Sequence, residues 1–575
     1  MSLAQSLLWL AGRLPDGMLR AGSRALFGGS WRRFVAAAQQ PEAAQHERLT
    51  TLLARAKDTE FGKQHDFAKI RTFADYRSAV PVQGYDGFEP YLLRMVEGER
   101  NLLIPDEPFF FGRSSGTTGT PKYIPVTEVY VAEYRLPRRV WARQVMQAFP
   151  GLVRGRMLTM HSPKIEGQTQ SGVPFGSVTV GLSTPRGKPQ AALQMGPMDA
   201  VPKQVYLLED FELKYYTILR MAAQQRISFA AAINPSTLVL LAEKLDAHAE
   251  QLAEDLESGT LTGIERIPPD FRRSLQGVLR KDRHAAARIR RSRADHGHVV
   301  ATDLWPQIAG LCCWKGGSAP FYLSQLPKWF PGREVMDYGF LATEGGFSIP
   351  LSTQGASGVV SVLGHVLEFV PEADMAQGDT SKAVLADGLE VGQRYRVLVT
   401  GAHGLYRYDI NDVVVCTGHF HKTAEIAFVH KGGNMLSVTG EQVGESHVVE
   451  AMRQAEKVTG QGCVGFSVTC LLEQPPRYAL AVEPQAELRE LTARDLLAAF
   501  ETGLRAVNME YEAKRDSQRL GPPVIKVLEA GAFDRYRAAR VAAGAPDSHV
   551  KPPHLVRDAS TVEGWGVAEQ WELNS

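Results

Sequence analysis

The sequence has few cysteines, almost no net charge and no long hydrophobic run. Its five cysteines form an odd set without metal-ligand spacing, which favours free thiols in a reducing compartment. With 64 basic and 63 acidic residues the net charge is +1, so bulk attraction to nucleic acid or to an acidic membrane is not expected. The longest early apolar run, Leu7 to Ala11, is too short to span a membrane and follows no basic region. We therefore expect a cytoplasmic protein with no nucleic-acid partner and no integral membrane association.

The totals are those of a globular protein with more than one domain. Apolar residues make up 44% and charged residues 22% of the chain, which is ordinary for a folded protein. A single compact core is not expected at 575 residues, and two or three domains are. We expect the adjacent thiols of Cys312 and Cys313 to be packed in a core rather than reactive.

The most informative stretch is FFFGRSSGTTGTPKYIPVT, residues 109 to 127. Its first three residues are typical of the end of a buried strand. Gly116 and Gly119 then give backbone freedom and let the main chain approach a ligand. Free N–H groups and clustered hydroxyls suit an anion, above all a polyphosphate, and Lys122 adds a positive charge. The hydroxyls belong to Ser114, Ser115, Thr117 and Thr118.

This loop is not a Walker loop, because its glycine and lysine spacing differs from that motif and Lys122 is followed by tyrosine. By composition alone, a Ser/Gly-rich surface loop is an equally good interpretation.

The order of helix and strand patterns predicts a layered α/β domain. Residues 1 to 60 are predicted as helices, and residues 128 to 149 as one long helix. A buried strand over residues 227 to 233 precedes Asn234, which suits a helix cap, and Pro235, which suits the first helical position. Strand, cap and helix in this order form a β–α unit.

Two segments of unusual composition have less certain roles. Residues 161 to 189 are rich in Gly, Ser, Thr and Pro without a helical period, and their apolar residues favour an irregular but ordered binding wall. Residues 280 to 293 are strongly basic, which we interpret as a solvated helix face, with nucleic-acid contact as the weaker alternative.

Two later stretches are predicted to join the loop in one site. In WKGGSAP, Gly316, Gly317 and Ser318 form a tight turn after an apolar strand, and further on an aromatic residue precedes Thr343 and Glu344. In YRVLVTGAHGLYRYDINDVV, residues 395 to 414, we predict a hairpin whose second strand ends near Asp412. A carboxylate there is able to accept two hydroxyls of a ribose, although a plain turn residue is the alternative.

The composition changes after Val429, where HKGGN suits a hinge. We therefore predict a large domain over residues 1–429 and a small α+β domain over 430–575. The small domain should contain a hairpin of strands 463–470 and 478–482. Its tail places Lys551 before two prolines, which would restrict it, although lysines in tails are usually solvated.

Loop, glycine turn, aromatic–Thr–Glu, Asp412, hinge and late lysine occur in the order of the adenylate-forming superfamily. The chain more closely resembles a bacterial member of the auxin-responsive Gretchen Hagen family of acyl-acid amido synthetases. The resemblance covers nearly the whole chain and is carried by SSGTTGTPKYIP, LYRYDINDVV, FVHKGGNMLSVTGEQVGE and GAFDRYRAARVAAGAPDSHVKPPHLV. It implies a large layered α/β N-terminal domain with a small α+β C-terminal lid domain.

The resemblance also implies roles for single residues. Ser114, Ser115, Gly116, Thr117, Thr118 and Lys122 would bind ATP phosphates. Gly316, Gly317 and Ser318 would line the adenine, and Phe340 would stack on it. Thr343 would contact the α-phosphate, Glu344 would ligate Mg²⁺, Asp412 would hold the ribose and Lys551 would be the lid lysine.

Three positions depart from the family pattern. Phe340 replaces the usual tyrosine, for which Tyr338 is a possible shifted substitute. Asn411 stands where glycine precedes the ribose aspartate, and Gln442 stands where a lysine is common after Glu441.

The function implied is that of an ATP-dependent acid–amino acid ligase. It would activate a small carboxylic acid as acyl-AMP and transfer the acyl group to an amino acid, with ATP and Mg²⁺ as cofactors. A thioester-forming acyl-CoA synthetase and a non-catalytic nucleotide-binding homologue are the alternatives. We expect a monomer.

Overall fold

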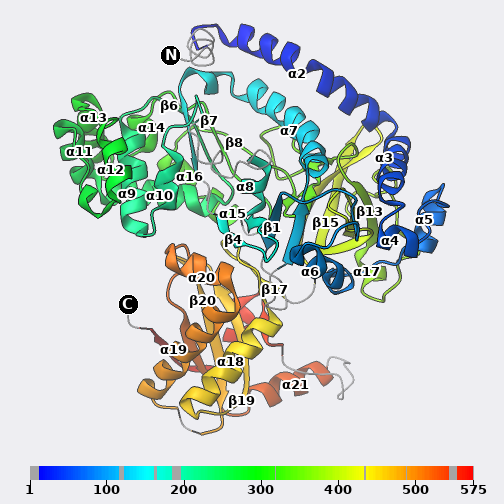
Figure 1. Ribbon diagram of the computed structural model, residues 1–575. Coiled ribbons are helices and arrows are strands. Elements are labelled where there is room, and N and C mark those ends of the chain that lie inside the picture. Colours follow the sequence, from blue (N-terminus) through cyan, green and yellow to red (C-terminus); the bar gives the residue numbers. More distant parts are fainter. Residues whose placement is uncertain are drawn as a thin grey trace. The chain divides into compact units, whose positions relative to one another are not determined.

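The computed structural model describes residues 12–114, 122–160, 165–183, 196–317, 319–432, 435–486, 488–542 and 553–573. The chain forms two compact units that divide between His430 and Lys431. In the larger unit the described residues form three sheets of four or six strands and a two-stranded hairpin, together with helices (Figure 1).

The chain begins with helices, as predicted. They are α2 (Asp16–Gln39), α3 (Pro41–Ala56), α4 (Glu60–Gln64), α5 (Phe73–Ala79), η1 (Tyr85–Gly87) and α6 (Glu89–Glu97). Thr72 and Asp75 form a capping box at the start of α5, and Gly98 ends α6 in the left-handed region at φ 106°. Local capping thus defines these boundaries.

The first sheet carries the strands on both sides of the Ser/Gly/Thr loop. It consists of β1 (Phe110–Ser114), β2 (Lys122–Val126), β4 (Ile165–Gln168) and β5 (Pro174–Gly176), in the order β2-β1-β5-β4. Residues 161–189 were predicted to be irregular, which is wrong for the described part. β4 and β5 pair as antiparallel strands, and α8 (Val178–Ser183) follows them. Short strands of three or four residues are too brief to show a periodic pattern.

The second sheet is fully parallel and matches the predicted β–α grammar. Its strands are β3 (Arg156–Met160), β6 (Ile227–Ala232), β7 (Gly310–Cys312) and β8 (Val335–Met336), in that order. Asn234 caps α10 (Pro235–Ala247) by accepting the N–H of Ser236, so the predicted cap is confirmed. Cys312 and Cys313 are fully buried at the end of β7, as expected, and burial raises the pKa of both thiols.

Short helices surround this parallel sheet, and Figure 1 shows those from α9 to α14 gathered on one side of it. They are η2 (Pro150–Arg154), η4 (Lys203–Leu207), α9 (Phe211–Ala223), α11 (Ala249–Ser258), η5 (Ile264–Arg266), α12 (Pro269–Gln276), α13 (Arg283–His296), α14 (Ala301–Leu304), α15 (Ala319–Leu323) and α16 (Leu326–Trp329). The basic run of residues 280–293 lies mostly in α13, where Arg290 pairs with Glu250 and Glu257. These pairs support the interpretation as a helix face.

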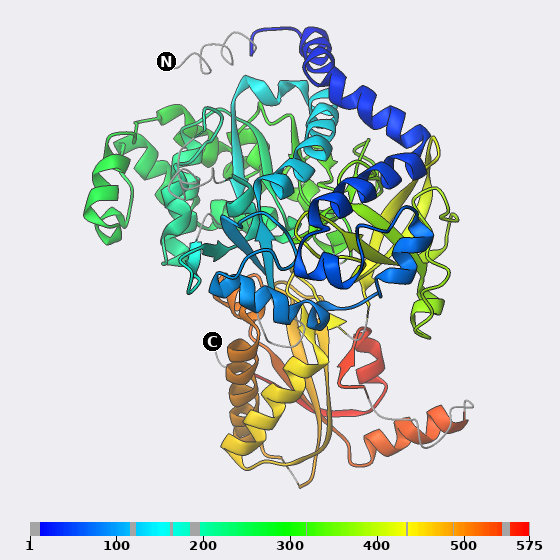
Figure 2. The ribbon, with the colours of Figure 1, turned by 45° about the vertical axis from the view of Figure 1, so that its right-hand side comes forward.

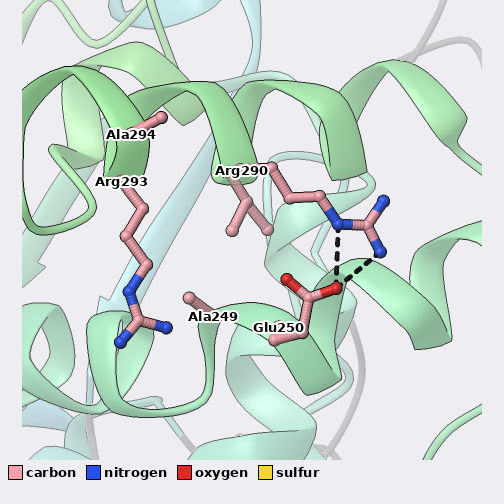
Figure 3. Close-up of a pocket in the computed structure, with 6 residues that line it drawn as sticks. Ala249, Glu250, Arg290, Arg293 and Ala294 are labelled. Atoms are coloured by element: carbon pink, nitrogen blue, oxygen red, sulfur yellow. Dashed lines mark hydrogen bonds and ion pairs between the residues drawn. The ribbon is translucent and has the colours of Figure 1, made fainter.

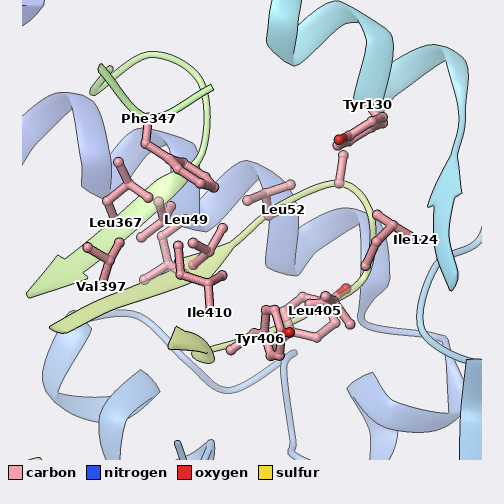
Figure 4. Close-up of a cluster of buried hydrophobic side chains, with 14 of the residues drawn as sticks. Leu49, Leu52, Ile124, Tyr130, Phe347, Leu367, Val397, Leu405, Tyr406 and Ile410 are labelled. Carbon is pink, nitrogen blue, oxygen red and sulfur yellow. The ribbon is translucent and has the colours of Figure 1, made fainter. Parts of the chain in front are cut away.

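The third sheet is antiparallel and forms a core with α3 and the long helix α7 (Glu128–Ala148). Its strands are β11 (Ser348–Ile349), β12 (Gly358–Val360), β16 (Thr423–Lys431), β15 (Tyr408–Phe420), β14 (Arg394–Thr400) and β13 (Val366–Pro371), in that order. A short helix, α17 (Glu372–Met375), follows β13. Figure 4 shows Leu49 and Leu52 of α3 and Tyr130 of α7 in the same buried cluster as Leu367 and Val397.

The smaller unit is a five-stranded mixed sheet with helices. Its sheet has the order β22-β19-β20-β21-β23. Its elements are β17 (Met435–Leu436), β18 (Val443–Gly444), α18 (Glu445–Thr459), β19 (Cys463–Leu471), β20 (Arg477–Pro484), α19 (Glu490–Val507), α20 (Met509–Asp516), β21 (Val524–Leu528), α21 (Ala532–Ala542), β22 (Leu555–Val556), α22 (Ala559–Glu563) and β23 (Val567–Glu572). The predicted hairpin of β19 and β20 is confirmed. Figure 2 shows α18 and α19 side by side along this sheet.

None of the helices in the described ranges is long and apolar enough to cross a membrane.

Candidate active site

A two-residue hairpin carries the predicted Thr343 and Glu344. β9 (Leu341–Ala342) and β10 (Gly345–Gly346) pair as antiparallel strands, so these two residues form the tip. A side chain at Gly345 would collide with the imidazole of His365 and with the Phe347 ring. This close approach explains why glycine follows Glu344.

Two tyrosines of α7 donate hydrogen bonds to the backbone of this hairpin. The Tyr130 hydroxyl donates a hydrogen bond to the carbonyl of Thr343 at 2.5 Å. The Tyr134 hydroxyl, one helical turn further on, donates to the carbonyl of Ala342 at 2.9 Å. Neither tyrosine was predicted from the sequence. Their spacing of four on the buried face of a helix was the available signal, but it equally fits plain core packing.

Glu344 lies among four tyrosines drawn from three elements. Only 8% of the residue is exposed. Burial and then, among other groups, the nearby charge of Glu344 raise the pKa of Tyr408 and of Tyr134. The same two causes contribute for Tyr85 and Tyr130. These hydroxyls therefore keep their protons and remain donors beside the carboxylate.

The donor set around Glu344 fits Mg²⁺ rather than an all-protein metal site. Within the described ranges, no group of three or more His, Cys, Asp or Glu residues is placed to hold a metal ion. Mg²⁺ is usually bound by one or two carboxylates together with substrate phosphates and water. A single hard oxygen ligand such as Glu344 meets that requirement.

Lys122 lies beside the same tyrosines. It is the first residue of β2, opposite Ser114 of β1. Its Nζ lies 3.4 Å from the Tyr408 hydroxyl and 5.3 Å from the centre of the Tyr85 ring. Lys122 and Glu344 thus share Tyr85 and Tyr408 as neighbours, which places opposite charges at one end of the first sheet.

Four other predicted residues of the nucleotide site, Ser115, Gly116, Thr117 and Thr118, lie outside the described residues, as do Ser318 and Lys551. Their predicted roles remain predictions.

Thr343 lies next to β1 and α8, at the point where the β9–β10 hairpin approaches the first sheet. A Cβ atom placed on Gly112 would lie 3.1 Å from Thr343 Cγ2 and 3.2 Å from Val178 Cβ. A side chain at this position would press on both neighbours, so glycine suits the close approach. The start of α8, within the predicted binding wall, consequently lies next to Thr343.

Three aromatic rings surround the glycine turn that follows β7. The ring of Phe428, on β16, lies 5.2 Å from Trp314 and 5.8 Å from Phe340. Gly317 has a φ of 59°, and a Cβ placed there would lie 3.4 Å from the Phe428 ring. A planar base is able to stack in such a setting. Trp314 and Phe428 were not predicted, since a single aromatic residue far away in the sequence gives no distinct signal.

Tyr338 does not substitute for the tyrosine missing at position 340. Its ring stacks on Trp141 at 5.4 Å with an interplanar angle of 17°. Burial and the neighbouring Cys312 raise the pKa of its hydroxyl. Tyr338 therefore belongs to the cluster around Trp141 and Met336, whereas Phe340 packs on Phe347 and Phe428.

A β-bulge determines the position of Asp412. β14 and β15 lose register opposite residues 410–412, and β15 continues to Phe420, so the predicted strand end near Asp412 is wrong. Asn411 has a φ of 63°, and its N–H donates to Asp409 at 2.8 Å. Asparagine tolerates this left-handed conformation better than other residues with a side chain. The bulge therefore accounts for asparagine in place of glycine, and Asp412 is 4% exposed beside it.

In the smaller unit, the chain that follows the predicted lid lysine is anchored to β19. The Ser467 hydroxyl donates to the Pro553 carbonyl at 2.5 Å, and the ring of His554 stacks on Phe466 at 4.5 Å. Near the hinge, Glu441 accepts hydrogen bonds from Val438, Thr439 and Tyr478. Glu441 is thus a buried structural acceptor, and the Gln442 carbonyl accepts from Asn508.

A shallow cavity of about 330 Å³ lies elsewhere, between α11 and α13 (Figure 3). Its lining includes the ion pair of Arg290 with Glu250, together with Ala249, Ile289, Arg293 and Ala294. None of the residues predicted from the sequence motifs lines it, so it is separate from the candidate active site.

Family models match the chain in three parts. The GH3 family N-terminal domain matches residues 30–335, the GH3 family central domain residues 359–431, and the GH3 family C-terminal domain residues 446–560.

Among similar proteins, the probable indole-3-acetic acid-amido synthetase GH3.1 of Arabidopsis thaliana is 23% identical over 91% of this chain and 90% of its own length. The jasmonoyl–L-amino acid synthetase JAR4 of Nicotiana attenuata is 22% identical over 89% of this chain and 90% of its own length. The solved GH3.15 acyl acid amido synthetase superposes with a TM-score of 0.61 at 19% identity, covering 94% of this chain and 96% of that one. This structural likeness confirms the predicted α/β fold class.

Proposed function

Because the chain belongs to the GH3 family, we propose that it is an ATP-dependent acid–amino acid ligase. It joins a small carboxylic acid to the amine of an amino acid through an acyl-AMP intermediate. The relatives are named as synthetases of this kind, acting on indole-3-acetic acid or forming jasmonoyl–amino acid conjugates. We propose that this chain works as a cytoplasmic monomer.

The observation that carries this proposal is the Thr343–Glu344 tip. It is held by Tyr130 and Tyr134, packed against β1 and accompanied by Lys122. Adenylation requires a carboxylate to approach the α-phosphorus while charge on the phosphates is stabilised. A buried metal-binding carboxylate and a lysine at the end of the phosphate-loop sheet suit this task.

In this proposal each group has one task. The loop from Ser114 to Thr118 binds the ATP phosphates, and Lys122 lies at its far end. Gly316, Gly317 and Ser318 line the adenine with Phe340, and Asp412 accepts the ribose hydroxyls. Glu344 holds Mg²⁺, which would neutralise phosphate charge when bound, and Thr343 contacts the α-phosphate. Lys551 reaches the reacting oxygens from the small domain.

Measurement of ATP–pyrophosphate exchange across a panel of carboxylic acids tests the first half-reaction. Acid-dependent exchange followed by amide formation with an added amino acid is the expected result. Product formation with coenzyme A but not with amino acids would indicate a thioester ligase instead. ATP binding without exchange for any acid would indicate a non-catalytic nucleotide-binding protein.

Replacement of the lid lysine tests the role of the small domain. We expect Lys551→Ala to slow acid-dependent exchange by ~10²–10³, as for loss of one transition-state donor. Exchange near the wild-type rate would remove Lys551 from the mechanism.

A further inference from the structure

The β9–β10 hairpin is too short to define its own conformation. Each strand has two residues, the ladder joins Gly345 to Ala342 and Gly346 to Leu341, and one further bond runs from the Phe347 N–H to the Phe340 carbonyl at 2.8 Å. Even longer isolated hairpins are marginally stable in water. The position of Thr343 and Glu344 must therefore depend on contacts from other elements.

Those contacts come from α7. The Tyr130 hydroxyl donates to the carbonyl of Thr343, and the Tyr134 hydroxyl donates to the carbonyl of Ala342, the residue before the tip. A Cβ atom on Gly346 would lie 3.6 Å from the Tyr134 ring, so the second strand also packs on this tyrosine. The two phenol rings lie 5.3 Å apart at 75°, and Tyr130 is fully buried. The two rings are therefore buried against each other in an edge-to-face arrangement.

The buried carboxylate of Glu133 fixes the rotation of α7. Both of its oxygens accept the N–H of Ala402 at 3.0 and 3.1 Å, and it pairs with Arg48 of α3. His365 Nδ1 lies 3.2 Å from it. Since Glu133 lies between the two tyrosines in the sequence, its anchors in α3 and the β14–β15 turn define where the tyrosine hydroxyls point.

We propose that Tyr130 and Tyr134, oriented by Glu133, are positioning residues that hold the Thr343–Glu344 tip for the adenylation half-reaction. This rests on the proposed function, in which Thr343 and Glu344 act on the phosphates of ATP. The acceptor step releases no pyrophosphate and so depends less on Glu344, whereas the contact of Thr343 with the α-phosphate serves both steps. α7 also begins directly after β2, whose first residue is Lys122, so one rigid segment places both Lys122 and the tip.

A displacement of about 1 Å in a catalytic group is able to cost up to about 10²-fold in rate. We therefore expect Tyr130→Phe to slow ATP–pyrophosphate exchange ~10-fold and the double variant with Tyr134→Phe ~10²-fold. Amide formation from a supplied synthetic acyl-adenylate should slow clearly less than exchange does. Equal losses in both half-reactions would overturn the proposal, because they would indicate general damage to the fold.

Tyr216→Phe is the matched control. The Tyr216 hydroxyl is also buried and donates to Asp255 at 2.6 Å, in the helical layer between α9 and α11. We expect a similar loss of thermal stability in this variant without selective loss of exchange. If the double variant does not fold, the single variant Tyr134→Phe provides the test. An exchange rate equal to that of wild type in this folded variant would also contradict the proposal.

Calorimetric binding separates this inference from the proposed function. Tyr130→Phe should weaken binding of ATP with Mg²⁺ but leave adenosine binding unchanged, because the rings of Trp314, Phe340 and Phe428 are untouched. A wild-type protein without exchange would refute the proposed function alone. Unchanged binding of ATP with Mg²⁺ in the folded variant would refute the positioning role.

Discussion

Asp255 and Glu133 are two buried carboxylates of the larger unit that accept similar sets of hydrogen bonds but lie in different regions. Asp255 of α11 accepts from Tyr216, Thr260 and Thr262, at 2.5 to 2.6 Å, among the helices beside the parallel sheet. Arg220, fully buried, donates to the Asp255 carbonyl. This carboxylate joins helices to one another and contacts no residue predicted for the active site.

Glu133 has a comparable set of partners behind the Thr343–Glu344 tip. Burial opposes its ionisation, but His365 and Arg48 hold the pKa of Glu133 below its usual value. Burial also lowers the pKa of the neighbouring His403 to about 3, so this imidazole is neutral. From this comparison we expect a similar buried carboxylate to serve stability alone in one region and both stability and the geometry of the candidate site in the other.

Replacing the carboxylate behind the site should have the largest effect. Glu133→Gln leaves Arg48 without its charged partner, which should cost about 3 kcal/mol, at the low end for a broken buried pair because Arg48 keeps some solvent exposure. ATP–pyrophosphate exchange should fall ~10-fold or more, because the carboxylate that orients α7 and the Thr343–Glu344 tip is lost. Urea unfolding and ATP–pyrophosphate exchange on the same preparation measure both.

Replacing the remote carboxylate should cost similar stability without a selective loss of activity. Asp255→Asn replaces a carboxylate oxygen that accepts from Tyr216, Thr260 or Thr262 with an amide NH₂ group, and should destabilise the unit by about 2–3 kcal/mol. At temperatures where the variant is folded, exchange should remain within about twofold of wild type. A selective loss of exchange in Asp255→Asn, or no selective loss in Glu133→Gln, would contradict the expected difference between the two carboxylates.

A third buried carboxylate, that of Asp337 after β8, extends the comparison of buried carboxylates to their dependence on pH. Burial raises the pKa of Asp337 to about 6, although the N–H groups of Gly339 and Lys315 oppose this shift. Since the folded pKa lies above the unfolded value of 3.8, its contribution to stability is complete below about pH 4 and is lost as the pH rises through about 6. The loss is on the order of 2–3 kcal/mol.

Asp337→Asn should therefore gain stability relative to wild type at about pH 8 and show little of this pH dependence. Unfolding curves at about pH 4 and pH 8 measure the difference. An identical pH profile in the variant and the wild type would rule out titration of Asp337 as the cause.

The smallest effect is expected at the bulge in β15. Asn411→Gly should alter the free energy of unfolding by less than about 1 kcal/mol, since glycine adopts the left-handed region freely. Asn411→Val should cost about 1–2 kcal/mol. Because the bulge places Asp412, valine should also weaken adenosine binding, which titration calorimetry measures. Equal stability of the two variants would contradict a strained position.

The sequence predicted the parts of the fold whose signals are local. β6, the β19–β20 hairpin and the Asn234 cap were predicted close to their observed positions, because strand runs and caps depend on a few adjacent residues. Residues 161–189 and the end of the strand at Asp412 were predicted wrongly. For residues 161–189 the partner strand β1 lies far away in the sequence, and for Asp412 a bulge against the neighbouring β14 lets the strand continue.

The candidate site divides in the same way. The order of motifs indicated Thr343, Glu344, Lys122 and Asp412, and the structure brings Glu344 and Lys122 to the same two tyrosines. Phe428 and the tyrosines of α7 were not predicted. Their function depends on which surface they face, and a sequence pattern shows only that they are apolar and periodic.

By itself, the sequence determined the fold class, the family and the residue types available for chemistry, because motifs and local propensities are carried by neighbouring residues. Only the tertiary structure decided which buried carboxylate stands behind the active site, that Tyr338 turns away from it, and that asparagine suffices at position 411. Each of these depends on contacts between segments hundreds of residues apart or on a backbone conformation imposed by a paired strand.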